Sequence, residues 1–169
     1  METIYIEKPS ELKRNIALLE KSLGISINLK GKLATISGLG LEEYEAHIIL
    51  EAISFGFSVK KSLLLLNPEF QFKRIKIKDF TRKKNLREVK SRIIGTKGKT
   101  LRTIENISNS YLILNEKNNE IGLITHADSV EETTTAIQNL IRGTKQSNVY
   151  HFLEKQNKAK KQGFDINKK

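Results

Sequence analysis

The feature that most constrains the fold is a repeated order of predicted elements on either side of Asn67-Pro68. Each half predicts a strand, a helix, a two-stranded hairpin and a further helix, and the two copies lie about 85 residues apart. The residue before a proline is pushed out of helical conformation, so Asn67 marks a boundary. We therefore expect an α+β chain of two small domains, each a three-stranded antiparallel sheet packed against helices.

The first half, residues 1–67, carries this pattern in its shortest form. Its first helix is expected to begin after Ser10, a residue type that caps helix N-termini, and to stop at Gly24. Only two residues separate the preceding strand from that helix, which leaves no room for an inserted loop. Residues 58–66 predict a linking helix capped by Ser58.

The second half, residues 68–145, is longer between its first strand and its middle helix. The strand at residues 70–77 changes phase midway, which suggests a bulge or a late start. A short helix and a glycine loop, residues 95–98, then precede the middle helix. Asn109 is expected to end that helix in left-handed conformation, and Ser129 is expected to cap the next one.

The ends and the apolar runs of the chain indicate a soluble, cytoplasmic protein. The start lacks the features of a signal peptide, and the longest apolar run, Leu63–Leu66, is too short to span a bilayer. No cysteine is present, which fits a reducing compartment and excludes disulfides and thiolate metal sites. Residues 146–169 predict an amphipathic helix whose Lys-rich end, residues 158–169, is expected to fray.

The positive charge of the chain is concentrated in one segment. The net charge is +11, and residues 70–104 hold 13 basic and only 2 acidic side chains. Residues 1–69 hold 8 basic and 9 acidic side chains, so the first half carries no excess. A generally lysine-rich surface would spread the charge evenly. The concentration instead predicts a polyanionic partner for the second half.

The loop Gly95-Thr96-Lys97-Gly98 lies within this basic segment. Glycines allow positive φ and a close approach of the backbone to a ligand, and the start of the following helix favours anions. This is how a KH module grips the backbone of about four nucleotides. A GxxG tetrapeptide alone is a weak signal. The preceding strand, the apolar pair before the loop and the surrounding charge strengthen it.

These patterns predict an RNA-binding surface around the loop. Cationic side chains should meet phosphates, while Ile93, Ile94 and the strand at residues 110–114 should line an apolar groove for bases. The predicted RNA-binding residues are Arg92, Ile93, Ile94, Gly95, Thr96, Lys97, Gly98, Lys99, Thr100 and Arg102.

Nucleotide hydrolysis and other catalysis find little support in the sequence. Gly98-Lys99-Thr100 resembles the end of a P-loop, but a P-loop requires glycine at position 93, where Ile93 stands. The three histidines fall in three different predicted elements without ligand spacing. We therefore expect no catalytic residue, no metal site and no cofactor.

A longer stretch resembles a known family. The block Val89–Thr100, with Arg92-Ile93-Ile94-Gly95 at its centre, is similar to the KH loop of the tandem-KH ribosome assembly factors called partner of Nob-one, or Dim-two. Residues 51–58 resemble an inter-domain helix of that family, and residues 149–155 its C-terminal signature. The resemblance covers roughly residues 45–161. Ser91 departs from it, because the family usually has glycine there.

This resemblance implies two type I KH-like domains in tandem, the first of them degenerate because it lacks GxxG. It also implies a small-subunit ribosome biogenesis factor, of archaeal rather than eukaryotic type, that binds single-stranded rRNA near the 3′ end and assists its maturation. The implied partners are a Nob-one-type endonuclease and the alpha subunit of translation initiation factor two.

Two alternatives remain open at the level of sequence. The chain could be a KH protein acting on other RNA, such as mRNA or an exosome-linked substrate. It could also be a KH-derived scaffold that binds proteins rather than RNA.

Overall fold

The computed structural model describes the backbone of residues 1–166 and the side chains of residues 1–163. It divides into two compact units, Met1–Phe72 and the chain from Lys73 onward, so the division falls inside strand β4 (Phe70–Lys76). The sequence places the boundary slightly earlier, before Pro68. No helix within residues 1–166 has the length and apolar character needed to cross a membrane.

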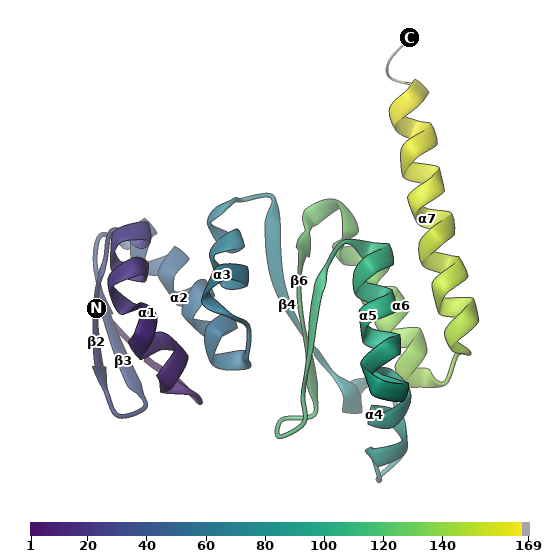
Figure 1. Cartoon of the computed structure of the whole chain (residues 1–169), viewed down its shortest axis with the longest axis horizontal. Helices are drawn as coiled ribbons and strands as arrows, with labels where there is room; N and C mark the ends of the chain where they lie inside the picture. The colour runs from purple at the N-terminus through teal and green to yellow at the C-terminus, as the bar shows by residue number, and fades with distance from the viewer. Residues whose placement is uncertain (167–169) are drawn as a thin grey trace. The chain divides into compact units, whose positions relative to one another are not determined.

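The first unit is a three-stranded antiparallel sheet with helices on one face (Figure 1). The sheet order is β1-β3-β2, and Ile27 of β2 pairs with Ile36 of β3. The apolar faces of α1 and α2 close a core with Leu12, Ile36 and Ile49 fully buried. In chain order its elements are β1 (Glu2–Tyr5), α1 (Pro9–Leu23), β2 (Ser26–Lys30), β3 (Leu33–Ser37), α2 (Gly40–Phe55), α3 (Val59–Ser62) and the 3₁₀ turn η1 (Leu63–Leu66).

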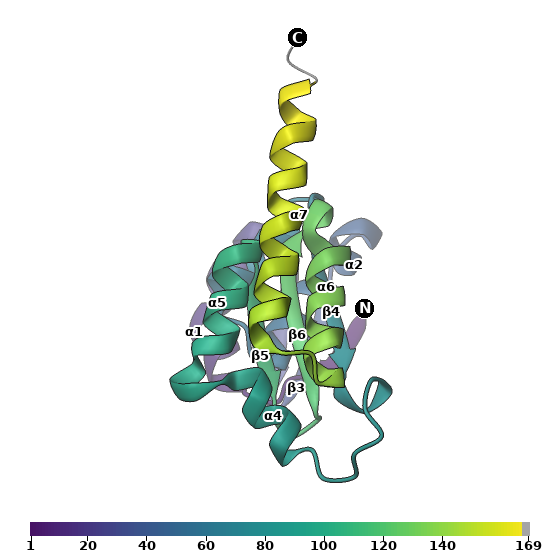
Figure 2. The ribbon, with the colours of Figure 1, turned by 90° about the vertical axis from the view of Figure 1, so that its right-hand side faces the viewer.

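The second unit repeats the sheet order, as β4-β6-β5, and adds helices. Its core buries Val89, Ile104, Leu123 and Ile137. Figure 2 shows the last helix lying over α5 and α6, and it packs against both. After β4 its elements are the 3₁₀ turn η2 (Ile77–Asp79), α4 (Arg87–Ile94), the 3₁₀ turn η3 (Thr96–Gly98), α5 (Lys99–Ser108), β5 (Tyr111–Asn115), β6 (Glu120–His126), α6 (Ala127–Arg142) and α7 (Gln146–Ile166). The α+β fold with two KH-like sheets is confirmed.

The repeat extends to single side chains. Helix α1 ends at Gly24 and α5 ends at Asn109, and both residues are in left-handed conformation. One turn before each end, a glutamate reaches past the helix to the following strand. Glu20 accepts a bond from the backbone N–H of Ile27 at 2.7 Å, and Glu105 accepts one from the N–H of Leu112 at 2.8 Å. Each glutamate therefore fixes the same helix–strand corner in its own unit.

The change of phase in β4 coincides with the division of the chain into two units. Phe72 belongs to the first unit, where its ring lies 5.9 Å from the rings of both Phe55 and Phe57. Ile75 lies in the core of the second unit. Residues three apart on a strand point to opposite faces, so one strand supplies both units.

Two of the expected helix caps are wrong. Helix α1 begins at Pro9 without a side-chain cap, because a proline at the first position has the helical φ and no N–H to satisfy. Helix α6 begins at Ala127, ahead of Ser129, and His126 caps it by accepting from the N–H of Asp128 at 3.2 Å. Ser58 caps α3 as expected, through the N–H of Lys61.

The expectation of a frayed C-terminal end is also wrong for most of that segment. Helix α7 continues to Ile166, and the amino group of Lys160 bonds to the carbonyl of Asp128 and to the Glu132 carboxylate. Asn157 donates to the carbonyl of Ile107 at 2.6 Å. These contacts extend the helix along the unit. Residues 167–169 of the predicted segment lie outside the described residues.

Candidate nucleic-acid interface

The loop from Gly95 to Gly98 links α4 to α5 through a tight turn of positive φ values. Gly95 ends α4 with φ 73°, Lys97 has φ 54°, and Gly98 has φ 74° as it begins α5. Left-handed conformation costs an L-residue roughly 1–2 kcal/mol, and only glycine adopts it freely. A lysine is therefore held in strained backbone geometry at the tip of the loop, as is common at functional sites.

The two glycines are required for different reasons. A Cβ atom on Gly95 would lie 2.1 Å from Oγ1 of Thr100, a distance that no packed side chain tolerates. A Cβ on Gly98 would meet no atom within 4 Å. Gly95 thus permits the loop to close against α5, whereas Gly98 leaves open space at the surface where a ligand can approach.

A residue at the start of α7 forms hydrogen bonds with both ends of the loop. The side-chain amide of Gln146 donates to Oγ1 of Thr100 at 2.9 Å and to the carbonyl of Arg92 at 3.1 Å. Thr100 is only 3 % exposed and is the residue against which Gly95 packs. Gln146 therefore ties α7 to both ends of the loop. No sequence pattern predicts this contact, because it joins residues 46 and 54 positions apart.

Two predicted RNA-binding side chains make contacts within the second unit. The guanidinium of Arg92 donates to the carbonyls of Leu140 at 3.2 Å and Ile141 at 3.0 Å, near the C-terminal end of α6. The Leu140 carbonyl also accepts from the backbone N–H of Gly143, whereas the Ile141 carbonyl lies in the last turn, where helix carbonyls lack an intrahelical partner. Thr100 is buried against Gly95, whereas Arg92 is half-buried with its guanidinium bonded to the end of α6.

The apolar residues before the loop also divide between two tasks. Ile93 is completely buried in the core of the second unit, so its side chain cannot meet a base. Ile94 is only half-buried and lies at the surface beside the loop. On the strand after α5, Ser110 and Leu112 are buried, whereas Tyr111 is 37 % exposed. Within the predicted groove, Ile94 and the exposed side of β5 are therefore the parts that a base could contact.

The remaining predicted residues present cations and polar groups to solvent. Lys97, Lys99 and Arg102 are exposed, as is Thr96. None of the three cations has an ion pair within residues 1–163, and Arg102 donates to the carbonyl of Lys97 at 2.5 Å. Arg102 thereby holds the tip of the loop while part of its charge faces outward. The loop combines a close backbone approach with uncompensated positive charge.

The backbone amides of the loop are less open than the sequence suggests. The N–H of Gly98 donates to the carbonyl of Gly95 at 3.2 Å, and the N–H of Lys99 donates to the carbonyl of Thr96. These two donors are occupied inside the turn. Two of the amides at the start of α5 are therefore not free to bind an anion in this conformation.

Elsewhere in the basic segment some charges are paired. The amino group of Lys83 donates to the Glu88 carboxylate at 3.0 Å and thereby lowers the pKa of Glu88. The guanidinium of Arg74 bonds to the Glu120 carboxylate at 2.6 Å. No group of three or more His, Asp or Glu side chains able to hold a metal ion occurs among the residues that the structure describes.

The chain is similar in sequence to KH-domain proteins of a known family. Residues 71–158, just over half of the chain, match the family model for the second KH domain of partner-of-Nob-one proteins, a eukaryotic-type KH domain (KH-domain type I). A KH domain-containing protein of Methanocaldococcus jannaschii is 28 % identical over 174 residues, which cover 98 % of this chain and 74 % of that protein.

Solved archaeal structures share the whole fold. Dim2p of Pyrococcus horikoshii, crystallised in a complex with a/eIF2alpha and rRNA, has a TM-score of 0.79 at 26 % identity, over 94 % of each chain. The same protein crystallised as Dim2p has a TM-score of 0.76 at 25 % identity, over 92 % of this chain and 99 % of that one. A protein of unknown function from Aeropyrum pernix has a TM-score of 0.81 at 24 % identity, over 98 % and 96 %, and shows the fold alone.

The match to the second KH domain contains the glycine loop, and the likeness to Dim2p includes the first unit as well. This chain therefore belongs to the partner-of-Nob-one (Dim2) family of RNA-binding KH-domain proteins, whose relatives here are archaeal.

Proposed function

We propose that the second domain, residues 68–145, binds single-stranded RNA through the loop Gly95–Gly98, and that the physiological RNA is small-subunit rRNA near its 3′ end. The observation that carries the proposal is the loop itself. Open space at Gly98 adjoins the exposed cations Lys97, Lys99 and Arg102, none of them paired within residues 1–163. Backbone phosphates fit this arrangement, because a KH loop grips about four nucleotides by their backbone.

The contact set that we propose is smaller than the sequence predicted. Thr96, Lys97, Gly98, Lys99 and Arg102 would meet the RNA backbone, and Ile94 would meet a base. Gly95, Arg92, Ile93 and Thr100 would act indirectly, by shaping and supporting the loop.

The choice of rRNA rests on family membership and on the related complex. Dim2p of Pyrococcus horikoshii has been crystallised with rRNA and a/eIF2alpha. A KH groove reads only about four nucleotides, so the groove alone cannot select one site among a cell's RNAs. We propose that the first domain, residues 1–67, and α7 supply further contacts, and that linked contacts raise selectivity by effective concentration.

The first proposed protein partner rests on family membership, and the second rests also on the crystallised complex of the related Dim2p. A Nob-one-type endonuclease would cut the rRNA that this protein positions, and the alpha subunit of initiation factor two would be a second partner. The protein would act in the cytoplasm as a maturation factor that binds RNA without cutting it.

The decisive experiment is crosslinking in the native cells, followed by sequencing of the attached RNA. We expect crosslinks concentrated at the 3′ end of small-subunit rRNA for the wild-type protein and a strong loss of them for Gly98→Asp. Crosslinks scattered over mRNAs would favour the alternative of a KH protein acting on other RNA. Crosslinks unchanged by Gly98→Asp would contradict the loop as the contact.

A further inference from the structure

The first unit, which lacks the glycine loop, has an apolar cavity of its own. It measures about 410 Å³ and lies between the first turns of α1, strand β2 and the β2–β3 turn. Pockets that hold small ligands commonly measure about 300–1,000 Å³, so this α1–β2 cavity is large enough for one bulky side chain. Among residues 1–163 it is lined by Pro9, Ser10, Lys13, Ile16, Leu29 and Gly31.

The α1–β2 cavity occupies the place that the predicted RNA groove has in the second unit. Glu20 matches Glu105, and Ile27 matches Leu112, so equivalent positions of the two units are 85 apart. At that offset, the lining residues Pro9, Ser10, Lys13, Ile16 and Leu29 correspond to Ile94, Gly95, Gly98, Leu101 and Leu114. The first unit therefore retains the groove of the repeat.

The apolar walls of the two grooves are alike. Ile16 and Leu29 are half-buried and pack against the core of the first unit. Leu101 and Leu114 are half-buried and pack against the core of the second unit in the same way. Each groove thus exposes the outer part of an apolar wall whose inner part belongs to the core.

The features that grip a nucleic-acid backbone are missing from the first groove. Gly98 has φ 74° and open space at its missing Cβ, whereas the matching Lys13 lies inside α1. Ser10, in the first turn of α1, stands in place of Gly95. A KH module grips phosphates through its glycine loop, whose backbone can approach them closely. The first groove is therefore suited to another kind of ligand.

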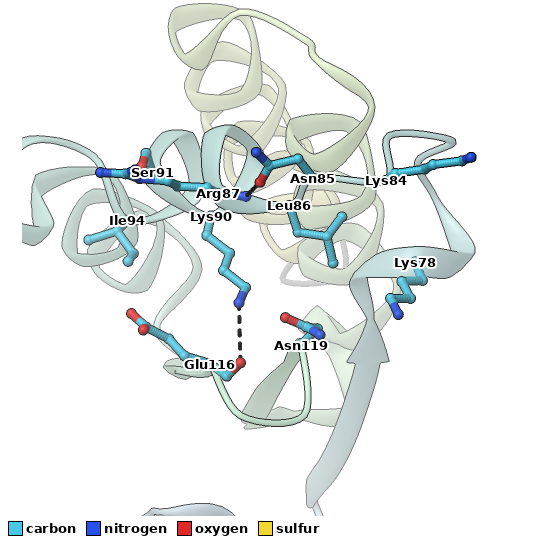
Figure 3. A pocket seen from close by; sticks show the side chains of 10 residues that line it. All are labelled: Lys78, Lys84, Asn85, Leu86, Arg87, Lys90, Ser91, Ile94, Glu116 and Asn119. Carbon is cyan, nitrogen blue, oxygen red and sulfur yellow. Dashed lines mark hydrogen bonds between the residues drawn. The ribbon is translucent and has the colours of Figure 1, made fainter.

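The first groove is also open at an end where the second is bridged. In the second unit, the amino group of Lys90 in α4 donates to the carbonyl of Glu116 in the β5–β6 turn at 3.2 Å (Figure 3). The described part of the first unit has no helix between β1 and α1. A Cβ on Gly31, which matches Glu116, would meet no atom within 4 Å. An extended ligand therefore has room to pass the β2–β3 turn.

Strand β2 offers backbone hydrogen-bonding groups beside the cavity. It is an edge strand, because β3 lies between it and β1. The N–H of Ile27 points away from β3, since it donates to the Glu20 carboxylate at 2.7 Å. Backbone groups alternate in direction along an antiparallel strand, so the N–H and C=O of Leu29 also point away from β3. Neither group of Leu29 has a hydrogen-bond partner in the described part of the chain.

The charged side chains at the cavity are cationic. Lys13 lines it, and Lys8 and Lys30 are next to lining residues in the sequence. All three are exposed and have no ion pair among residues 1–163. The carboxylate of Glu11 accepts from the N–H of Val59 at 3.3 Å and so points toward α3. Clefts lined by charge of one sign attract ligands of the opposite sign.

We propose that the α1–β2 cavity docks an extended acidic segment of a partner protein. The segment pairs its backbone with Leu29 at the edge of β2 and inserts one bulky apolar side chain against Ile16. Lys13 meets a carboxylate near the inserted side chain. In strand addition of this kind, main-chain hydrogen bonds give affinity and side-chain pockets give specificity. The proposal goes beyond RNA binding by the second unit and does not depend on it.

The test uses the ¹⁵N-labelled full chain and pools of nine-residue peptides. The first pool has leucine at the centre, aspartate two residues to either side and random uncharged residues elsewhere. A second pool has alanine at the centre, and a third has lysine in place of aspartate. Lys13→Glu reverses the charge at the cavity. Lys21→Glu is the matched control, because Lys21 is also exposed and unpaired within residues 1–163 and lies about 12 Å further along α1.

The leucine–aspartate pool should shift the NMR signals of the Leu29 and Gly31 amides saturably and leave that of Gly98 unchanged. The alanine pool should bind about fivefold more weakly or worse, because it buries less apolar surface. Lys13→Glu should bind the leucine–aspartate pool about three- to tenfold more weakly and the lysine pool more tightly than the wild type does. Lys21→Glu should change neither affinity by more than about twofold. The same spectra report whether each variant is folded.

Three results would each overturn the proposal: no shift at Leu29 and Gly31, equal affinity for the leucine and alanine pools, or equal losses in the two lysine variants. A single-stranded RNA of eight nucleotides serves as the competing ligand in Gly98→Asp. If it shifts Leu29 and Gly31 more strongly than the peptides do, the cavity is a nucleic-acid site and the proposal fails. Gly98→Asp should bind the peptides as the wild type does, so failure of the loop assignment would leave this result unaffected.

Discussion

Three residues lead from β1 to α1 in the first unit, whereas twenty-two lead from β4 to α5 in the second. Around this difference the two units share a frame. Both have the same sheet order, the same left-handed helix end and the same glutamate that fixes the helix to the next strand. The comparison shows that the KH-like frame folds with or without the binding loop. The loop is an insertion that the shared frame accommodates, and we propose that RNA binding depends on it.

The charges of the two units differ in the same way. Residues 1–69 carry a slight negative excess, and residues 70–104 carry the whole positive excess of the chain. The charge therefore accompanies the inserted loop. The cations are thus concentrated where we propose that the RNA binds.

The largest expected effect comes from separating the units. Residues 1–72 contain a core cluster of their own and also hold the contact of Phe72 with Phe55 and Phe57, so we expect them to fold alone. Their affinity for an eight-nucleotide RNA should fall at least a hundredfold below that of the full chain, because no glycine loop or basic surface is present. Fluorescence anisotropy measures this, and circular dichroism checks the fold. Comparable affinity of residues 1–72 and the full chain would contradict the proposal that the second unit binds the RNA.

A smaller effect is expected from a single glycine in each unit. Gly98→Asp places a carboxylate beside the expected phosphate and should weaken RNA binding at least tenfold, or about 1.4 kcal/mol. Gly31→Asp is the matched control, because Gly31 also has positive φ (62°) and open space around its missing Cβ. Both variants should lose similar stability, since aspartate tolerates left-handed conformation moderately well. Equal loss of RNA affinity in the two variants would contradict the proposal that RNA contacts the loop of the second unit and not the first unit.

Gly95→Asp is a poorer test of the same loop. Its Cβ would collide with Thr100, so loss of binding would follow from a distorted loop as readily as from a lost contact. We expect Gly95→Asp to lower the free energy of unfolding well below that of Gly98→Asp. Thermal denaturation of the two variants measures the difference.

We expect an intermediate effect from removing the hydrogen bonds that Gln146 makes to the two ends of the loop. Gln146→Leu removes the donor to Thr100 and to the carbonyl of Arg92, and should destabilise the second unit by about 1 kcal/mol. RNA affinity should fall about threefold, because the loop loses hydrogen bonds that position it but loses no contact with the RNA. Gln156→Leu, a half-buried glutamine on the same helix without a side-chain bond in residues 1–163, is the control. Unchanged amide exchange in the loop of the Gln146 variant would contradict this role.

The smallest expected effect separates stability from function at one residue. Lys97 has φ 54° and ψ 32°, a conformation that asparagine adopts more readily. Lys97→Asn should raise the free energy of unfolding by up to about 1 kcal/mol and lower RNA affinity a few-fold through the lost charge. Chemical denaturation and RNA titration measure the two quantities. A variant that is less stable and binds normally would show that the loop is not strained for binding.

Local sequence patterns were sufficient for the elements and their order. Gly24 and Asn109 end their helices as expected, and Ser58 caps α3. Ser10 and Ser129 failed as caps because other residues met the same need nearby, by proline geometry at Pro9 and by a histidine ring nitrogen at His126. Helix starts are ambiguous in sequence since several residue types can satisfy the first N–H groups.

The sequence by itself determined where the glycine loop and the basic segment lie, because glycine spacing and clustered charge are local properties of the chain. It could not assign tasks within the predicted contact set. Arg92 and Lys99 are equally cationic in sequence, yet Arg92 is bonded to the end of α6 and Lys99 is free at the surface. The bonds of Gln146 and the cavity of Ile16 and Leu29 depend on contacts between separate segments. Only the tertiary structure decides these, because burial and hydrogen-bond partners arise when separate elements pack together.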